Sequence, residues 1–454
     1  MLSVWRAATL SITIDEAYTY NEFVSQGFAG IFEYYDANNH VLHSALVWLS
    51  TSILGLSEFS MRIPALTGSA LYLYCLLRLI ESISFRAHGW LHALVYAVLI
   101  CNPLTLDLLC VARGYSLALG FFALALWRLV AYLERNQSRD IWWTSLALGL
   151  SVASNLAFIF PGIAALCVAL CVVAKCGLLR RDLQSALLPA AVVLVAILAL
   201  PLSKSDRSHF YWGAKDIPES IRSTTIPFLQ HHPVDPGPFG TPKVLQRFQR
   251  RFVPIAMLIL LIATLHWLLR GERPSLTLIA AVFAVTLFGY WLAHVWLSVP
   301  YPSERTGLPV VFFFFLTLGG AVSYLIRYRS AAVLIGLPAV LIFAALLMQF
   351  GAQADPSYVW AWHTNRDDRH IADLLREHRI KTASIHWTLQ PSMEFYRRAG
   401  RIPTAVKPFP KYQGEKPPLK GHDAYVLSRP ADTLDLDVQY RNQVTGVTVA
   451  FQRP

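Results

Sequence analysis

The chain has 454 residues, of which 55% are hydrophobic and only 15% are charged. Soluble domains usually carry about 25% charged residues, so this composition excludes an ordinary soluble protein and indicates a polytopic α-helical membrane protein. The formal net charge is +11. No basic–aromatic module accompanies this charge, so we expect no nucleic-acid partner and assign the charge to loops held against anionic membrane lipids.

The chain opens with fourteen mostly apolar residues, "MLSVWRAATLSITI", which are too short to span a bilayer. They resemble the tail of a longer membrane helix whose start is missing. An acidic pair, Asp15 and Glu16, follows directly. We therefore expect residues 1–59 to hold a truncated first helix and a first outer loop.

This first loop contains one short apolar run, "VLHSALVWLSTSILGL" at 41–56. With about sixteen apolar residues it is shorter than a span, which favours a helix lying in the membrane interface. Just before it, Asp36, His40 and His43 fall at helical spacing. The spacing is compatible with a metal site, but no second set of supporting residues is visible, so a metal is not required.

Ten longer apolar runs follow, and the connections after alternate runs are basic. The runs are 60–80, 90–110, 114–133, 141–157, 159–175, 183–202, 252–270, 275–297, 308–326 and 331–350. The basic connections hold Arg78, Arg86, Arg135, Arg139, Lys175, Arg180, Arg181, Arg270, Arg273, Arg327 and Arg329. The positive-inside rule makes these connections cytoplasmic, which predicts about 10–11 spans and places the remaining loops outside. The six cysteines lie in or beside the runs and predict no disulfide framework.

A large outer loop at 203–251 interrupts the predicted transmembrane domain 60–350. It ends in "KVLQRFQRRF", where Lys243, Arg247, Arg250 and Arg251 share a helical face. Basic residues are disfavoured on the outer side. Two interpretations stay open: an ordinary interfacial anchor, or a patch that contacts a lipid phosphate.

The tail 351–454 is the one soluble segment of domain size. "DDRHIADLLREHRI" is an amphipathic helix, "PSMEFYRRAG" predicts a second helix, and "TASIHW", "DAYVLS" and "TGVTVAF" predict strands. Alternating helices and strands indicate a small α/β domain on the outer side.

Ionisable residues gather at the outer ends of the predicted spans. They are Arg62 in "SMRIPAL", Asp107, Arg113 and Tyr115 in "LDLLCVARGYSLAL", and Glu304 and Arg305 in "YPSERTGLP". Each alone is compatible with snorkelling or structural pairing. Together they favour a functional site, because charged groups near hydrocarbon are costly.

The order of these motifs resembles the C-type-fold membrane glycosyltransferases, the superfamily of dolichyl-phosphate-mannose protein mannosyltransferases and aminoarabinose transferases. The motifs that carry the resemblance are "DEAYTY", "NNHVLHSALVWL", "GLSEFSMRIPAL", "ARGYSLAL", "YPSERTGLP" and "SIHWTLQPSMEFYRR". Two departures stand out: the first membrane helix is cut short, and Val41 stands where many relatives have proline.

The resemblance implies a polyprenyl-phosphate-sugar donor and a glycan, lipid or protein acceptor. It assigns the catalytic base to Asp15, with Glu16 beside it, and makes Asp107 the nearest candidate for a second acid or substrate contact. Tyr115 and Glu304 join Asp107 as candidate substrate contacts. It also implies an integral membrane protein, expected in a bacterial inner membrane with the site on the periplasmic side.

The residues suit this chemistry independently of the resemblance. A base must take a proton from the acceptor hydroxyl, and cations must stabilise the departing phosphate. We predict that His40, Arg62, Arg113 and Arg305 bind the donor phosphate, because guanidinium groups match phosphate oxygens. One carboxylate base suffices when the leaving group is already an anion, so we expect an inverting single displacement without a required cofactor.

Other classes of protein remain open at this stage. A multi-span transporter or lipid flippase would also carry intramembrane charges, although no pair of related halves is visible in the sequence. A non-catalytic assembly protein, or a transferase of acyl or phosphoethanolamine groups, is also compatible. The sequence does not identify the sugar or the acceptor.

Overall fold

The computed structural model describes most of the chain. The described residues are 1–83, 89–175, 180–206, 212–231, 235, 237–270, 274–326, 334, 336–408, 421–427 and 436–452. The basic residues Arg86, Arg273, Arg327 and Arg329, on which the orientation prediction partly depends, lie outside these ranges.

The chain divides into two compact units. Unit 1 comprises Met1–Ile31, Ser44–Ile63 and Asp355–Pro454, and unit 2 comprises Phe32–His43 and Pro64–Ala354. The sequence predicts the domains 1–59, 60–350 and 351–454, and this division stays a prediction. The structure, however, joins the N-terminal segment and the C-terminal domain in one unit.

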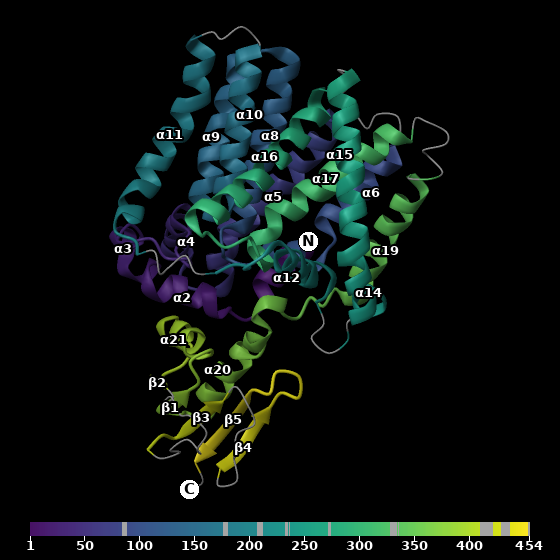
Figure 1. Ribbon diagram of the computed structural model, residues 1–454. Helices are drawn as coiled ribbons and strands as arrows, with labels where there is room; N and C mark the ends of the chain where they lie inside the picture. Colours follow the sequence, from purple (N-terminus) through teal and green to yellow (C-terminus); the bar gives the residue numbers. More distant parts are fainter. Residues whose placement is uncertain are drawn as a thin grey trace. The chain divides into compact units, whose positions relative to one another are not determined.

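Unit 2 is a helical bundle, in which α8, α9 and α11 run side by side (Figure 1). Its elements are the later part of α5 (Glu58–Ser82), α6 (Gly89–Ile100), α7 (Pro103–Leu108), α8 (Tyr115–Arg135), α9 (Ser138–Ser154), η2 (Leu156–Phe158), α10 (Ile159–Lys175), α11 (Arg180–Ser203), α12 (Ile217–Leu229), α13 (Gly237–Gly240), α14 (Pro242–Arg247), η4 (Phe248–Phe252), α15 (Val253–Arg270), α16 (Pro274–Leu297), η5 (Glu304–Gly307), α17 (Leu308–Leu325) and α19 (Leu337–Gln353).

Seven helical segments of the described chain are long and apolar enough to cross a membrane. They are Glu58–Ser82, Tyr115–Arg135, Leu156–Lys175, Arg181–Ser203, Pro242–His266, Pro274–Leu297 and Glu304–Leu325. The other three predicted spans correspond to the shorter helices α6, α9 and α19, of 12, 17 and 17 residues. The class of polytopic α-helical membrane protein is therefore confirmed.

The predicted span 90–110 is divided between α6 and α7. Asn102 caps α7 by accepting a hydrogen bond from the Thr105 backbone N–H, and Pro103 occupies the first helical turn. Proline has no N–H to donate and fits best at a helix start. A cap followed by proline therefore starts a new helix within an apolar run.

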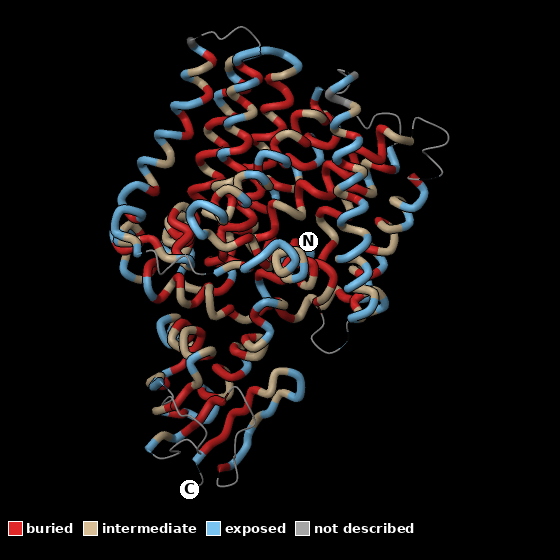
Figure 2. Tube along the Cα trace, viewed as in Figure 1, coloured by how far each residue is buried: buried red, intermediate tan, exposed pale blue. Residues whose placement is uncertain are grey.

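The core of the bundle is continuous through the middle of unit 2, where buried residues follow the inward faces of the helices (Figure 2). The Phe122 and Phe313 rings meet edge to face, with centroids 5.4 Å apart. Gly120 of α8 lies so close to α5 that a Cβ there would be 2.6 Å from the Gly68 carbonyl oxygen. Glycine thus permits α5 and α8 to cross at backbone contact.

Unit 1 combines the C-terminal domain with the N-terminal helices. Its elements are α1 (Leu2–Thr9), α2 (Ile14–Glu22), η1 (Val24–Gln26), α3 (Gly27–Ile31), most of α4 (Val41–Leu54), the start of α5, η7 (Trp360–Asn365), α20 (Asp368–Glu377), β1 (Thr382–Ile385), α21 (Gln390–Arg398), β2 (Ala405–Pro408), β3 (Ala424–Leu427), β4 (Leu436–Arg441) and β5 (Thr448–Gln452).

The C-terminal domain has a five-stranded sheet in the order β2-β1-β3-β5-β4. β1 pairs in parallel with β2 and β3, whereas β5 is antiparallel to β3 and β4. Ile371 and Leu375 of α20 and Met393 of α21 are fully buried, as amphipathic helices require. The prediction of a small α/β domain is confirmed.

Candidate functional site

The acidic pair lies at the start of α2 in unit 1. Thr13 is the N-cap: its side chain accepts a hydrogen bond from the Glu16 N–H, and the Glu16 carboxylate accepts one from the Thr13 N–H. This capping box follows from the sequence "TIDE", in which threonine and glutamate stand three residues apart. Asp15 occupies the second helical position and is half-buried. The positive end of the helix dipole therefore lies at Asp15.

Glu16 is committed to a buried ion pair with Arg62. The Arg62 Nε donates to Glu16 Oε1 at 2.9 Å and its Nη2 donates to Oε2 at 2.7 Å. The same guanidinium also donates to the carbonyl oxygens of Ala7, Leu10 and Ser11. This geometry does not favour the predicted role of Arg62 as a phosphate ligand, because its donors are spent within unit 1. It also leaves Asp15 as the better candidate for a base.

A cationic cluster forms in unit 2, where the loop before α4 meets the turn before α8. His40 is 5% exposed, and its ring lies edge to face with the Tyr115 ring at 5.8 Å. Within the described part of the chain, neither ring nitrogen of His40 has a hydrogen-bond partner. Gly114, with φ +69°, makes the close approach possible, since a Cβ there would be 3.1 Å from the His40 Cβ.

Two arginines complete this cluster. The buried Arg113 donates from Nη1 to the Asn38 carbonyl oxygen at 3.4 Å, and the half-buried Arg305 lies over the Trp212 ring at 5.7 Å. The pKa of His40 is held well below its ordinary value, first by burial and then by Arg113, His43 and Arg305. Burial and these neighbouring cations favour a neutral His40, and the two guanidinium groups give the cluster a positive potential suited to an anion.

Asp107 is also in unit 2, where it faces His231, a residue that no local sequence pattern singles out. Its Oδ1 is 2.9 Å from Nε2 of His231, and both side chains are buried. The backbone N–H of His231 donates to Gln353 Oε1 at 2.9 Å. The side-chain amide of Gln349 donates to the Leu229 carbonyl oxygen at 2.7 Å. His231, just after α12, is therefore bonded to both α7 and α19.

Glu304 adjoins the cluster through Arg305, its neighbour in η5. Its φ of +48° is unusual for a residue with a side chain, and Ser303 caps the turn. This backbone fixes the direction in which Arg305 leaves the chain.

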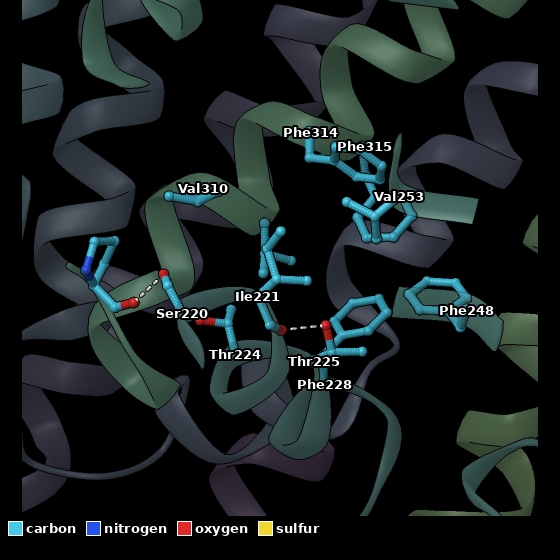
Figure 3. Close-up of a pocket in the computed structure, with 12 residues that line it drawn as sticks. Ser220, Ile221, Thr224, Thr225, Phe228, Phe248, Val253, Val310, Phe314 and Phe315 are labelled. Carbon is cyan, nitrogen blue, oxygen red and sulfur yellow. Dashed lines mark hydrogen bonds between the residues drawn. The ribbon is translucent and has the colours of Figure 1, made fainter. Parts of the chain in front are cut away.

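An apolar groove of about 100 Å³ lies between α12, η4, α15 and α17 (Figure 3). Phe228, Phe314 and Phe315 are among the residues that line it. Two hydroxyls at its wall are already bonded: Ser220 donates to the Pro302 carbonyl oxygen and Thr225 to that of Ile221 (Figure 3). The groove thus suits a hydrocarbon chain better than a sugar.

The basic patch predicted from the sequence borders this groove. Phe248, a wall residue, opens a π-helical turn that also contains Arg250 and Arg251. Lys243 and Arg247 precede it on α14, and all four cations are exposed. The structure therefore places these cations beside an apolar surface, and both interpretations of the patch remain compatible with this placement.

No group of three or more metal-ligating side chains converges within the described residues. Asp36, considered above with His40 and His43, accepts a hydrogen bond from the Asn38 N–H at 2.8 Å and forms a turn.

No protein-family model and no curated protein matches the chain. Among solved structures, it is similar to ArnT from Cupriavidus metallidurans bound to undecaprenyl phosphate, with 14% identity, a TM-score of 0.47, and coverage of 99% of this chain and 95% of ArnT. The apo state of ArnT is 13% identical, with a TM-score of 0.48 and coverage of 98% of this chain and 95% of ArnT. A third similar structure is the archaeal oligosaccharyltransferase AglB from Archaeoglobus fulgidus in complex with an inhibitory peptide and a dolichol-phosphate. It is 14% identical, with a TM-score of 0.42 and coverage of 88% of this chain and 61% of AglB. Likeness at this level does not transfer an activity, so the function below is derived from the residues of this chain.

Proposed function

We propose that the chain is a membrane glycosyltransferase that moves a sugar from a polyprenyl-phosphate donor to an acceptor hydroxyl. The observation that carries the proposal is the cationic cluster of His40, Arg113 and Arg305, in which a buried histidine lies with two arginines. The two guanidinium groups supply positive charge and forked donors, and the histidine ring can donate a further hydrogen bond, a combination that suits a phosphate.

In the proposed reaction, Arg113 and Arg305 bind the donor phosphate and His40 donates a hydrogen bond to it. The bond between the anomeric carbon and the phosphate oxygen breaks, and its electrons leave with the phosphate. The acceptor oxygen attacks the opposite face of the sugar while the carboxylate of Asp15 takes its proton. The product is inverted, and no second acid is required because the leaving group is already an anion.

The polyprenyl chain would occupy the apolar groove. Pro302 is on its wall, and Arg305 follows three residues later. A donor with its phosphate at Arg305 therefore finds hydrocarbon-compatible surface nearby. Lys243, Arg247, Arg250 and Arg251 would contact phosphates of the donor or of surrounding lipid.

The remaining features of the proposal come from the sequence. The active site and the C-terminal domain lie on the outer, periplasmic face of a bacterial inner membrane, and Arg and His supply the positive charge without a metal. The acceptor is a glycan, a lipid or a protein, and the transferred sugar is a hexose or a pentose.

Binding of undecaprenyl phosphate to the full chain in nanodiscs tests the cluster. Arg113→Ala and Arg305→Ala should each weaken binding by about 10-fold or more, because a charged hydrogen bond contributes about 1.5–3 kcal/mol. The corresponding lysine variants should lose less, since they keep the charge and lose only the fork. Arg139→Ala, an exposed arginine on α9, is the control. Unchanged affinity in both cluster alanine variants would remove the phosphate assignment.

A further inference from the structure

The segment that leads into α2 is held by the C-terminal domain, more than 340 residues away in sequence. Arg6 donates to the Tyr358 carbonyl oxygen, and Ser11 donates to that of Arg366 at 2.7 Å. Arg369 donates to the Leu10 carbonyl oxygen, and its own N–H donates to the Ser11 hydroxyl. Residues 6–14 are thus fixed on one side by the domain within unit 1.

Two further contacts from the C-terminal domain fall on either side of the N-cap Thr13. The Ile12 N–H donates to the Tyr396 hydroxyl at 3.3 Å, and the Ile14 N–H donates to Asn365 Oδ1 at 3.2 Å. The first N–H groups of a helix have no partner within the helix. The C-terminal domain therefore supplies an acceptor for the N–H of Ile14 and orders the residue that precedes the cap.

Both acceptors are themselves held in place. The Tyr396 hydroxyl donates to Glu58 Oε1 at 3.1 Å, and Arg369 and Arg401 also donate to this carboxylate. The Asn365 amide donates to Asp368 Oδ2 at 2.8 Å. Neither acceptor is free to rotate away without losing a second bond.

The domain also contacts the body of α2. Asn21 donates from Nδ2 to the Pro391 carbonyl oxygen at 2.9 Å, and the Tyr20 ring meets the Phe395 ring edge to face at 5.7 Å. The helix is therefore held at its start and nearly two turns later, so its rotation about its own axis is restricted. That rotation decides where the Asp15 side chain points.

We propose that the C-terminal domain is a positioning element for the acidic helix, and that Tyr396 and Asn365 are positioning residues that act through the start of α2 on Asp15. This inference rests on the proposed role of Asp15 as the base. It gives the α/β domain a part in the transfer step itself, separate from any acceptor binding. A base misplaced by about 1 Å loses on the order of 100-fold in rate, so partial loosening should be visible in turnover.

Tyr396→Phe tests the inference, because it removes two hydrogen bonds and keeps the ring. The control is Tyr425→Phe, which changes another buried tyrosine of the same domain that makes none of the bonds to residues 6–14. The full chain in nanodiscs is assayed with a radiolabelled polyprenyl-phosphate sugar, with undecaprenyl phosphate binding measured in parallel. Hydrogen exchange of peptides covering residues 8–20 reports the order of the helix start.

In Tyr396→Phe we expect kcat to fall about 10-fold, undecaprenyl phosphate affinity to stay within about twofold, and exchange to rise around Ile12. Asn365→Ala should act in the same direction, and Tyr425→Phe should match the wild type. A purely structural role would lower the melting temperature and leave kcat per folded molecule unchanged, which would overturn the inference. Full transfer by Asp15→Asn would instead overturn the proposed base, and the positioning role with it.

Discussion

Adjacent carboxylates have different surroundings at the start of α2. Both oxygens of Glu16 accept hydrogen bonds, from Arg62 and from the Thr13 N–H, and the side chain is fully buried. Asp15 is half-buried and lies at the positive end of the helix. Glu16 therefore stabilises the fold through its pair with Arg62, whereas Asp15 is the residue proposed to react.

Glu16→Gln should therefore act on stability more than on chemistry. Removing one partner of a buried pair leaves an uncompensated charge on Arg62 and costs about 3–5 kcal/mol. We expect a lower melting temperature, with turnover per folded molecule reduced less than in Asp15→Asn. Adding Arg62→Met should recover part of the loss. A melting temperature equal to that of the wild type would contradict the pairing.

Asp368 gives a prediction about pH. Burial raises the pKa of this carboxyl well above its ordinary value, although Ser392 and Asn365 hydrogen-bond to it and lower the pKa in part. Because the pKa is higher in the folded state, protonated Asp368 contributes to the free energy of unfolding. This contribution is fully present below the ordinary aspartate pKa of about 3.9 and is lost as pH rises through the raised pKa of the folded state.

Asp368→Asn should remove this dependence, since the amide stays neutral at every pH. We expect the variant to melt above the wild type at pH 8, with the difference shrinking toward pH 4. Melting curves of the full chain across this range provide the measurement. Parallel pH profiles for the two proteins would show that Asp368 does not carry the effect.

The turn before α8 is an element whose geometry depends on one glycine. Gly114 adopts φ +69°, and a Cβ there would collide with the Ser154 carbonyl oxygen and press on the His40 side chain. Gly114→Ala should displace the loop that carries His40 and weaken undecaprenyl phosphate binding by about 10-fold, because strain of about 1–2 kcal/mol is added at the site. Gly89→Ala, at an open helix start, is the control. Equal affinity for undecaprenyl phosphate in the two variants would show that the turn at Gly114 does not position the cluster.

Much of the fold at element scale follows from the sequence. The run 41–56 was predicted to be a short helix, and α4 covers Val41–Leu54. Periodicity also predicted the helices and the strands β1, β3 and β5 of the tail. The break between α6 and α7 was missed because an apolar run hides it, although Asn102 and Pro103 carried the signal.

The candidate site was only partly predictable for a physical reason. His40, Arg113, Arg305 and Tyr115 were selected because charge at membrane depth is costly, and the structure brings them together. His231 and Tyr396 were missed, because their partners are more than 120 residues away and no local pattern reports such pairing. Arg62 was predicted to bind the donor phosphate, a role that its buried ion pair with Glu16 does not favour.

For the whole molecule, the orientation in the membrane is the next prediction. The basic connections place the α8–α9 connection in the cytoplasm and the α12 region outside. A cysteine at Ser220 should react with a membrane-impermeant thiol reagent in intact cells with a permeable outer membrane, and one at Gln137 should react only after lysis. Native cysteines are first replaced by serine or alanine. If only the cysteine introduced at Gln137 is labelled in intact cells, the predicted orientation is wrong.

The central claim is that the chain transfers a sugar from a polyprenyl phosphate with Asp15 as the base. The most direct measurement is transfer by the purified full chain in nanodiscs, using radiolabelled polyprenyl-phosphate hexoses and pentoses with cell-envelope extract as acceptor. We predict transfer by the wild type, and a loss of about 10²–10⁴-fold in a folded Asp15→Asn variant that still binds undecaprenyl phosphate. Near-wild-type transfer by that variant would contradict the assigned base. Movement of the donor lipid across the bilayer without any transfer would contradict the enzyme class.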